Sequence, residues 1–240
     1  MKLSGSEIII ESLKKEGVDY IFGYPGGAVL HIYDALFAAK DIKHVLVRHE
    51  QGATHAADGY ARACNKPGVV LVTSGPGITN CVTGIATAHM DSIPMIVISG
   101  QVSRQYVGSD AFQEADATGI TRPICKHNFL INDRESIADT FRKAFIIATT
   151  GRPGPVIIDI PKDLTDPSVK IDFEYKRNIK IRSYQIKTNE DENKIEDAAK
   201  ILCSAKKPMI YTGGGVILSK ASKELIKLTK LLNFPITNTL

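Results

Sequence analysis

The sequence contains no tryptophan, and only four of its 240 residues are cysteines. The cysteines, Cys64, Cys81, Cys125 and Cys203, lie far apart in the sequence, and no two of them form a CxxC pair. This spacing argues against a disulfide framework and against a zinc site, so we assign no metal ligand to this chain. Sparse, unclustered cysteines are typical of proteins in a reducing compartment, and the sequence therefore predicts a cytoplasmic location.

Long apolar runs and a strong charge of one sign are also missing. No stretch reaches the length of a membrane span, and no signal-peptide core follows Met1. The 30 Lys and Arg residues exceed the 26 Asp and Glu residues by only four, which is too little to indicate a nucleic-acid partner. A hydrophobic content of 43% is that of an ordinary globular protein. We therefore expect neither membrane nor nucleic acid as a partner.

Short apolar segments alternate with helical patterns along the first 165 residues. This alternation predicts right-handed βαβ units, and hence an α/β fold with a doubly wound parallel sheet. We expect strands at 18–23, 42–47, 69–73, 95–99 and 156–160. Helices are expected at 4–16, 29–39, 53–63, 80–91 and 135–150.

The composition changes near residue 165, which indicates a second domain. Residues 166–188 are charged and without period, so we expect an irregular linker there. A second α/β unit is predicted over 189–240, with two helices and two strands. So few elements cannot close a core of their own, and we therefore expect this second domain to be incomplete.

Glu50 is the most unusual charged residue, because it closely follows the strand predicted at 42–47. Ligands of parallel α/β sheets bind at the carboxyl ends of the strands. A carboxylate there should be partly desolvated at the lip of a crevice. The alternative is an ordinary carboxylate in the first turn of the next helix, where the macrodipole favours it. These residues alone support both readings equally.

Two glycine-rich turns follow other predicted strands. Gly26 and Gly27 let the backbone approach a ligand closely, although a plain strand-to-helix connection is the simpler explanation. The turn at 74–77 places backbone N–H groups at the start of a helix, where they can face an anion. It lacks the third glycine of a dinucleotide fingerprint, so it is a weak signal for nucleotide binding.

Six blocks of sequence, taken together, resemble the large catalytic subunit of the acetolactate synthase (acetohydroxyacid synthase) family. Members of this family are thiamine-diphosphate enzymes of branched-chain amino-acid biosynthesis. The blocks occur in the family's order and extend through the first 155 residues. They are FGYPGGA at 22–28, RHEQGA at 48–53, TSGPG at 73–77, GSDAFQE at 108–114, KHN at 126–128 and GRPGP at 151–155.

The resemblance implies a pyrimidine-binding domain over residues 1–165, followed by the start of a flavin-binding central domain. It implies condensation of two pyruvates, or of pyruvate with 2-ketobutyrate, with loss of CO2. The products are 2-acetolactate and 2-aceto-2-hydroxybutyrate. The implied cofactors are thiamine diphosphate, FAD and Mg2+. The expected ligands of the Mg2+ ion lie outside this chain. The implied partners are a second copy in a homodimer or homotetramer and a small regulatory subunit.

The resemblance also assigns roles to residues. Glu50 is expected to hydrogen-bond the aminopyrimidine of the cofactor, which favours the functional reading of its position. Gln113 matches an active-site glutamine, and Lys162 matches a lysine of the substrate channel. The expected thiamine-diphosphate contacts, besides Glu50, are Gly26, Gly27, Ala28, Pro76 and Asn80. The expected flavin contacts are Ser92, Arg152, Gly213, Gly214 and Gly215.

Two alternatives stay open. One is a related thiamine-diphosphate enzyme, such as pyruvate oxidase or catabolic acetolactate synthase, although the blocks at 110–114 and 152–155 favour the first reading. The other is a non-catalytic interaction module, because the diphosphate- and magnesium-binding residues are absent from this sequence. For the same reason we expect the chain alone to be inactive. Ser103 stands where many plant members have proline, so herbicide sensitivity is not predicted.

Overall fold

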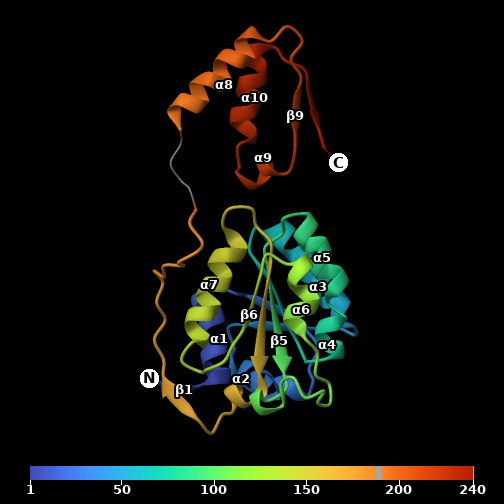
Figure 1. The fold of residues 1–240 in the computed structure, drawn as a ribbon, viewed down its shortest axis with the longest axis vertical. Coiled ribbons are helices and arrows are strands. Elements are labelled where there is room, and N and C mark those ends of the chain that lie inside the picture. Colours follow the sequence, from blue (N-terminus) through green and yellow to red (C-terminus); the bar gives the residue numbers. More distant parts are fainter. Residues whose placement is uncertain (187–190, 240) are drawn as a thin grey trace. The chain divides into compact units, whose positions relative to one another are not determined.

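The computed structural model describes residues 1–186 and 191–239. The chain divides into two compact units, Met1–Ile186 and Lys187–Leu240. Figure 1 shows the ribbon of each unit.

The first unit is built on a six-stranded sheet in the order β3-β2-β4-β5-β7-β6, in which every pairing is parallel. This confirms the predicted doubly wound parallel sheet. Strands β4, β5 and β7 are buried along their whole length, as expected for central parallel strands. The strands are β2 (Tyr20–Gly23), β3 (Lys43–Leu46), β4 (Gly68–Val72), β5 (Met95–Gln101), β6 (His127–Leu130) and β7 (Pro155–Pro161).

Strand β6 was not predicted from the sequence. It lies at the sheet edge and pairs only with β7 among the described strands. Its four residues, HNFL, are exposed or half-buried. An edge strand of this kind has neither the continuous apolar run nor the alternation by which strands are recognised.

Helices cover both faces of this sheet (Figure 1). One layer contains α1 (Gly5–Lys15), α2 (Leu30–Ala38) and α7 (Ile137–Thr149). The other contains α3 (Glu50–Cys64), α4 (Pro76–Thr79), α5 (Val82–Met90) and α6 (Ala117–Thr121). Short 3-10 turns occur at η1 (Gly27–Val29), η2 (Arg104–Tyr106), η3 (Arg122–Ile124) and η4 (Lys162–Thr165).

The helix predicted at 80–91 forms as α5, and a separate short helix, α4, precedes it where the sequence predicted only a turn. Pro76 starts the short helix α4, whose C-cap is Asn80, and α5 begins two residues later at Val82. A proline suits the first turn of a helix because its missing N–H is not needed there. The break places Asn80 between the two helices.

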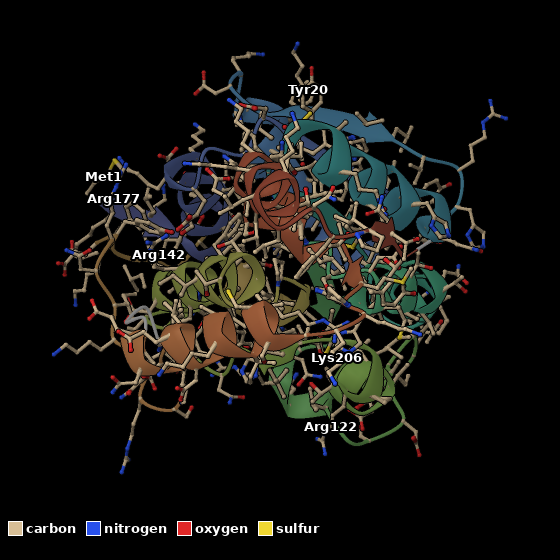
Figure 2. All side chains as sticks on the ribbon, turned by 90° about the horizontal axis from the view of Figure 1, so that it is seen from above. Met1, Tyr20, Arg122, Arg142, Arg177 and Lys206 are labelled. Carbon is tan, nitrogen blue, oxygen red and sulfur yellow. The ribbon has the colours of Figure 1, made fainter. Side chains whose placement is uncertain are left out.

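Residues 170–172 form a strand, so the irregular conformation expected for this part of 166–188 is wrong. Strand β8 (Lys170–Asp172) pairs antiparallel with β1 (Lys2–Ser4), and Phe173 N donates to Met1 O at 2.9 Å. The α7 residue Arg142 donates to the carbonyl of Arg177 at 2.8 Å, and Figure 2 labels Met1 and both arginines on one side of the view. Local composition did not reveal this pairing, because β1 and β8 lie at opposite ends of the first unit's sequence.

The predicted boundary between linker and second domain, at 188 and 189, lies outside the described residues. The second unit contains α8 (Glu192–Ser204), β9 (Ile210–Thr212), α9 (Gly215–Leu218), α10 (Ser222–Leu232) and β10 (Ile236–Asn238). Strands β9 and β10 pair in parallel. None of its three helices contains a buried residue, as expected for a unit without a closed core.

Within residues 1–186 and 191–239, no helix combines the length and the apolarity needed to cross a membrane.

Candidate functional site

The carboxyl ends of the parallel strands meet at one edge of the sheet, and predicted site residues follow five of them. Gly26 comes after β2, Glu50 after β3, Pro76 after β4 and Lys162 after β7. The loop that contains Gln113 follows β5. The topology therefore brings together residues that lie more than a hundred positions apart in the sequence.

Glu50 is the first residue of α3 and is only 9% exposed. The sequence left open whether Glu50 is a carboxylate in the first turn of a helix or a partly desolvated carboxylate. In the structure it starts the helix and is also buried. Asn80 Nδ2 donates a hydrogen bond to Glu50 Oε2 at 2.9 Å. In the described part of the chain, Oε1 accepts no hydrogen bond, and it is not among the fully enclosed unpaired atoms. Glu50 therefore has one oxygen held in place and one oxygen available.

The half-buried Tyr33 and the buried Cys81, which the sequence reading did not select, lie close enough to Glu50 to interact with its charge. Burial raises the pKa of the Tyr33 phenol and of the Cys81 thiol, and the Glu50 carboxylate raises both further. Tyr33 Oη also donates to Leu71 O at 3.2 Å. Both groups therefore stay neutral. Tyr33 gave no signal of its own, because it occupies an ordinary position in the pattern of α2.

The turn at Gly26 packs against the end of β4. A Cβ on Gly26 would lie 2.5 Å from Thr73 Cβ, so a side chain cannot be placed there without displacing β4. Ala28 N donates to Thr73 Oγ1 at 3.3 Å. A Cβ on Gly27, in contrast, would point into open space. The turn thus keeps an accessible backbone beside the Thr73 hydroxyl. The sequence reading did not identify Thr73 as a partner of this turn.

Gly75 brings the loop of Gln113 to the same edge. Its φ of +60° is a conformation that glycine adopts readily. A Cβ on Gly75 would lie 2.7 Å from Gln113 O, so the two backbones are in direct contact. Gln113 itself has a φ of +61°. The backbone of this loop therefore lies against the turn that leads to Pro76 and Asn80.

Lys162 begins η4 directly after β7 and is half-buried. The next residue, Asp163, connects this turn to η2. Arg104 donates from its backbone N to Asp163 Oδ1 at 2.9 Å and from Nε to Oδ2 at 2.7 Å. Burial alone would raise the pKa of Asp163, but the hydrogen bonds and charge of Arg104 outweigh it and the pKa is lowered. Lys162 is thus held near the start of the Gln113 loop.

The predicted flavin contacts lie elsewhere. Arg152 Nε donates to Ser92 Oγ at 2.8 Å, so these two residues are in contact. They precede β7 and β5, respectively, and therefore lie at the amino edge of the sheet, opposite Glu50. Gly213, Gly214 and Gly215 belong to the second unit, where the first two connect β9 to α9 and Gly215 begins α9.

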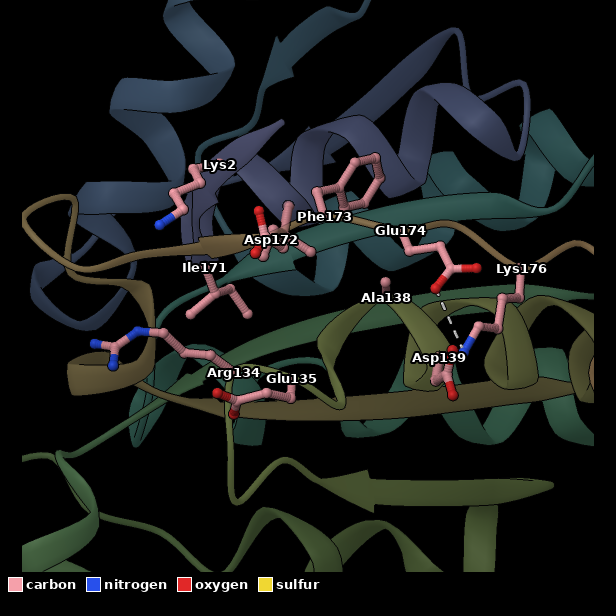
Figure 3. Close-up of a pocket in the computed structure, with 11 residues that line it drawn as sticks. Lys2, Arg134, Glu135, Ala138, Asp139, Ile171, Asp172, Phe173, Glu174 and Lys176 are labelled. Atoms are coloured by element: carbon pink, nitrogen blue, oxygen red, sulfur yellow. Dashed lines mark ion pairs between the residues drawn. The ribbon is translucent and has the colours of Figure 1, made fainter.

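A surface cavity of about 460 Å³ is a further feature of the first unit (Figure 3). It lies beside β8 and α7, and its lining includes Lys2, Arg134 and Asp139 as well as the ion pair between Glu174 and Lys176. It includes none of the predicted site residues. Its lining residue Arg134 donates to the carbonyls of Asp163 and Leu164 in η4, but Glu50 and Asn80 are not among the lining residues.

The chain is similar to known proteins along its whole length. Residues 3–120 match the profile "Thiamine pyrophosphate enzyme, N-terminal TPP binding domain", and residues 195–240 match the profile "Thiamine pyrophosphate enzyme, central domain". The chain belongs to the thiamine pyrophosphate enzyme family. The two matches cover parts of the first and second units, respectively.

The chain is similar along its whole length to acetolactate synthase large subunits. Identity is 54% over 239 residues with the protein of Haemophilus influenzae and 57% over 238 residues with that of Buchnera aphidicola subsp. Schizaphis graminum. It is 51% over 238 residues with the isozyme 3 large subunit of Escherichia coli. These alignments cover 99–100% of this chain but only 42% of each relative.

The residues at the carboxyl edge fit thiamine diphosphate. A half-paired, buried carboxylate is suited to a ring nitrogen that gains and loses a proton. The open space at Gly27 leaves room for a group beside the backbone. Among the described residues, no group of three or more His, Cys, Asp or Glu side chains is placed to hold a metal ion.

Proposed function

We propose that the protein to which this chain belongs is an acetolactate synthase large subunit. It condenses two pyruvates, or pyruvate and 2-ketobutyrate, with loss of CO2 and with thiamine diphosphate as the cofactor. The observation that carries this proposal is the buried Glu50 with one oxygen held by Asn80 and the other available. The relatives of 51–57% identity support the choice of reaction.

Each residue at the carboxyl edge has a role in this proposal. Glu50 accepts and returns a proton at the aminopyrimidine, and the Asn80 amide keeps its carboxylate in the required rotamer. The backbone of Gly26, Gly27 and Ala28 and the turn at Pro76 surround the cofactor. Bound thiamine diphosphate supplies the nucleophilic carbon and the electron sink.

Gln113 and Lys162 are proposed as the residues that contact the 2-keto acids. Both belong to segments that start at the carboxyl edge, and Arg104 ties the two segments together through Asp163. A lysine can pair with the substrate carboxylate, and a glutamine amide can donate to a substrate oxygen.

Other parts of the proposal concern cofactors and partners. FAD is assigned to Ser92, Arg152 and the glycines at 213–215, and Mg2+ to ligands outside this chain. We also propose a homodimer or homotetramer and, because the relatives are named large subunits, a small regulatory subunit. The free cysteines are compatible with the predicted cytoplasmic location.

Product analysis tests this proposal. The complete protein, supplied with thiamine diphosphate, Mg2+ and pyruvate, should release 2-acetolactate. Acetyl phosphate or acetate as the product would instead identify an oxidase of the pyruvate oxidase type. No turnover of pyruvate by a folded, cofactor-saturated protein would favour an interaction module and would overturn the proposal. Omission of thiamine diphosphate is the control.

A further inference from the structure

A pair of buried polar residues lies beneath the loop of Gln113. Gln101, the last residue of β5, is 4% exposed, and Asp159 of β7 is 2% exposed. Gln101 Nε2 donates to Asp159 Oδ2 at 3.0 Å and to Ala115 O at 2.9 Å. Gln101 Oε1 accepts from Val102 N at 2.8 Å. Every polar atom of this amide is therefore used, and its orientation is determined.

The hydrogen bond from Gln101 Nε2 to Ala115 O holds the C-terminal end of the Gln113 loop in place. Ala115 follows Gln113 by two residues, and its carbonyl also accepts from Ala117 N at 2.8 Å. Within the loop, the Glu114 carboxylate accepts from the backbone N of Gly108 and of Ala111. The loop is thus closed on itself by Glu114 and anchored to the sheet by Gln101. Arg104 and Asp163 anchor its other end.

Asp159 is costly to bury and is nevertheless present. Its Oδ1 is enclosed without a hydrogen-bond partner among the described residues. Burial raises the pKa of this carboxyl to about 7, and the charge of Asp116 adds to the effect, while the hydrogen bonds of Gln101 and Ser99 oppose it. An apolar residue would pack here at lower cost. Only an acceptor at this place, however, holds the second N–H of Gln101.

We propose that Gln101 and Asp159 are positioning residues that hold the loop of Gln113 in place for catalysis. This inference rests on the proposed function, since it takes Gln113 to contact the substrate. Asp159 orients the Gln101 amide, Gln101 holds the Ala115 carbonyl, and the loop presses the Gln113 backbone against Gly75. Neither side chain is among the predicted contacts of cofactor or substrate.

Three variants of the complete protein test the pair. Gln101→Met removes both donors at similar length, Asp159→Leu removes the acceptor, and Asp159→Asn keeps an acceptor for Gln101. Ile157→Val is the matched control, because it lies on the same face of β7 and is equally buried. Hydrogen exchange of the segment 104–117 reports the order of the loop, and steady-state kinetics report kcat and KM.

We expect Gln101→Met and Asp159→Leu to speed exchange of this segment by about tenfold, the factor for loss of roughly one hydrogen bond. Their kcat should fall by about 10- to 100-fold, with a smaller change in KM, because misplaced contacts cost mainly turnover. Asp159→Asn should restore both readouts to near wild type. Ile157→Val should lower the melting temperature and leave both readouts unchanged.

Two outcomes would overturn the inference. Unchanged exchange of 104–117 in a folded Gln101→Met protein would show that the pair does not hold the loop. Faster exchange with unchanged kcat would show that loop order is irrelevant to catalysis. The exchange measurement does not depend on turnover, so failure of the proposed function can be distinguished from failure of the inference.

Discussion

The two helix layers of the first unit are built from different residues. The layer of α1, α2 and α7 is filled by large side chains such as Ile8, Leu13 and Phe141. The layer of α3 and α5 is filled by small ones such as Ala57 and Ala88. Large residues provide buried area, whereas small residues let helices lie close to the sheet and to one another. Glu50 and Asn80 both belong to the small-residue layer.

The difference teaches how stability and chemistry are divided in this unit. In the small-residue layer, a Cβ on Gly84 of α5 would lie 2.0 Å from Thr54 Oγ1 of α3, so the two helices are in close contact. This contact places the start of α3 beside the turn of α4. In the large-residue layer, the helices bury their apolar faces and present no predicted catalytic residue. Mutations in the two layers should therefore differ in what they impair.

The largest effect on function is expected for Glu50→Gln in the complete protein. The amide keeps the shape of the side chain but cannot take up a proton as a carboxylate does. Turnover should fall by about 10²–10⁴-fold, or roughly 3–5 kcal/mol of barrier, with unchanged circular dichroism. Steady-state acetolactate formation is the measurement. Wild-type turnover would show that Glu50 serves only the start of α3.

The largest effect on stability is expected for Phe141→Ala in the other layer. Phe141 is fully buried in the core between α7 and the sheet. Removing the ring should lower the free energy of unfolding by about 3–5 kcal/mol, because the cavity cannot collapse completely. Urea unfolding of the 240-residue chain measures this. Exposed Phe37→Ala is the matched control and should cost little. Equal losses for both would contradict the division of the layers.

The third prediction concerns the buried acid in the small-residue layer. Burial raises the pKa of Asp159 to about 7, above about 3.9 in an unfolded chain. Between these values only the folded state holds the proton, so the stability that this group contributes is full below pH ~4 and is lost as the pH rises to ~7. Asp159→Asn does not titrate. The free energy of unfolding of Asp159→Asn, relative to that of the wild type, should therefore rise by a few kcal/mol between pH ~4 and pH ~7.

Paired denaturant titrations at intervals from pH 4 to pH 8 measure this difference directly. Other titrating groups are common to both proteins and cancel. Parallel stability curves for wild type and Asp159→Asn would show that Asp159 has an ordinary pKa and would remove the electrostatic cost assigned to it.

The smallest effect is expected for Gly84→Ala. The added methyl group would displace Thr54 and push α5 away from α3. Overpacking of this kind costs about 1–3 kcal/mol of stability. Thermal unfolding measures the loss. Ala86→Gly on the half-buried face of the same helix is the control for helix propensity. A Gly84→Ala protein as stable as wild type would mean that the two helices can separate without cost.

Much of the fold could be predicted from local sequence. The capping box of Ser4 and Glu7 starts α1 where expected, because both partners lie within one turn. The apolar run at 68–72 forms a central strand, since only a strand buried on both faces is apolar throughout. Strands β1 and β8 could not be predicted, because they are short and stabilise each other across nearly the whole unit.

The candidate site divides in the same way. The sequence by itself determined the candidate residues, because motifs such as RHEQGA and GSDAFQE are local. Only the tertiary structure decided that Asn80 contacts Glu50, that Gly75 supports Gln113, and that Gln101 connects Asp159 to Ala115. Each of these contacts joins different strands or helices, and parallel pairing brings them to one edge. Spacing along a chain cannot specify such contacts, because strand order, and not sequence distance, determines which strand ends are neighbours.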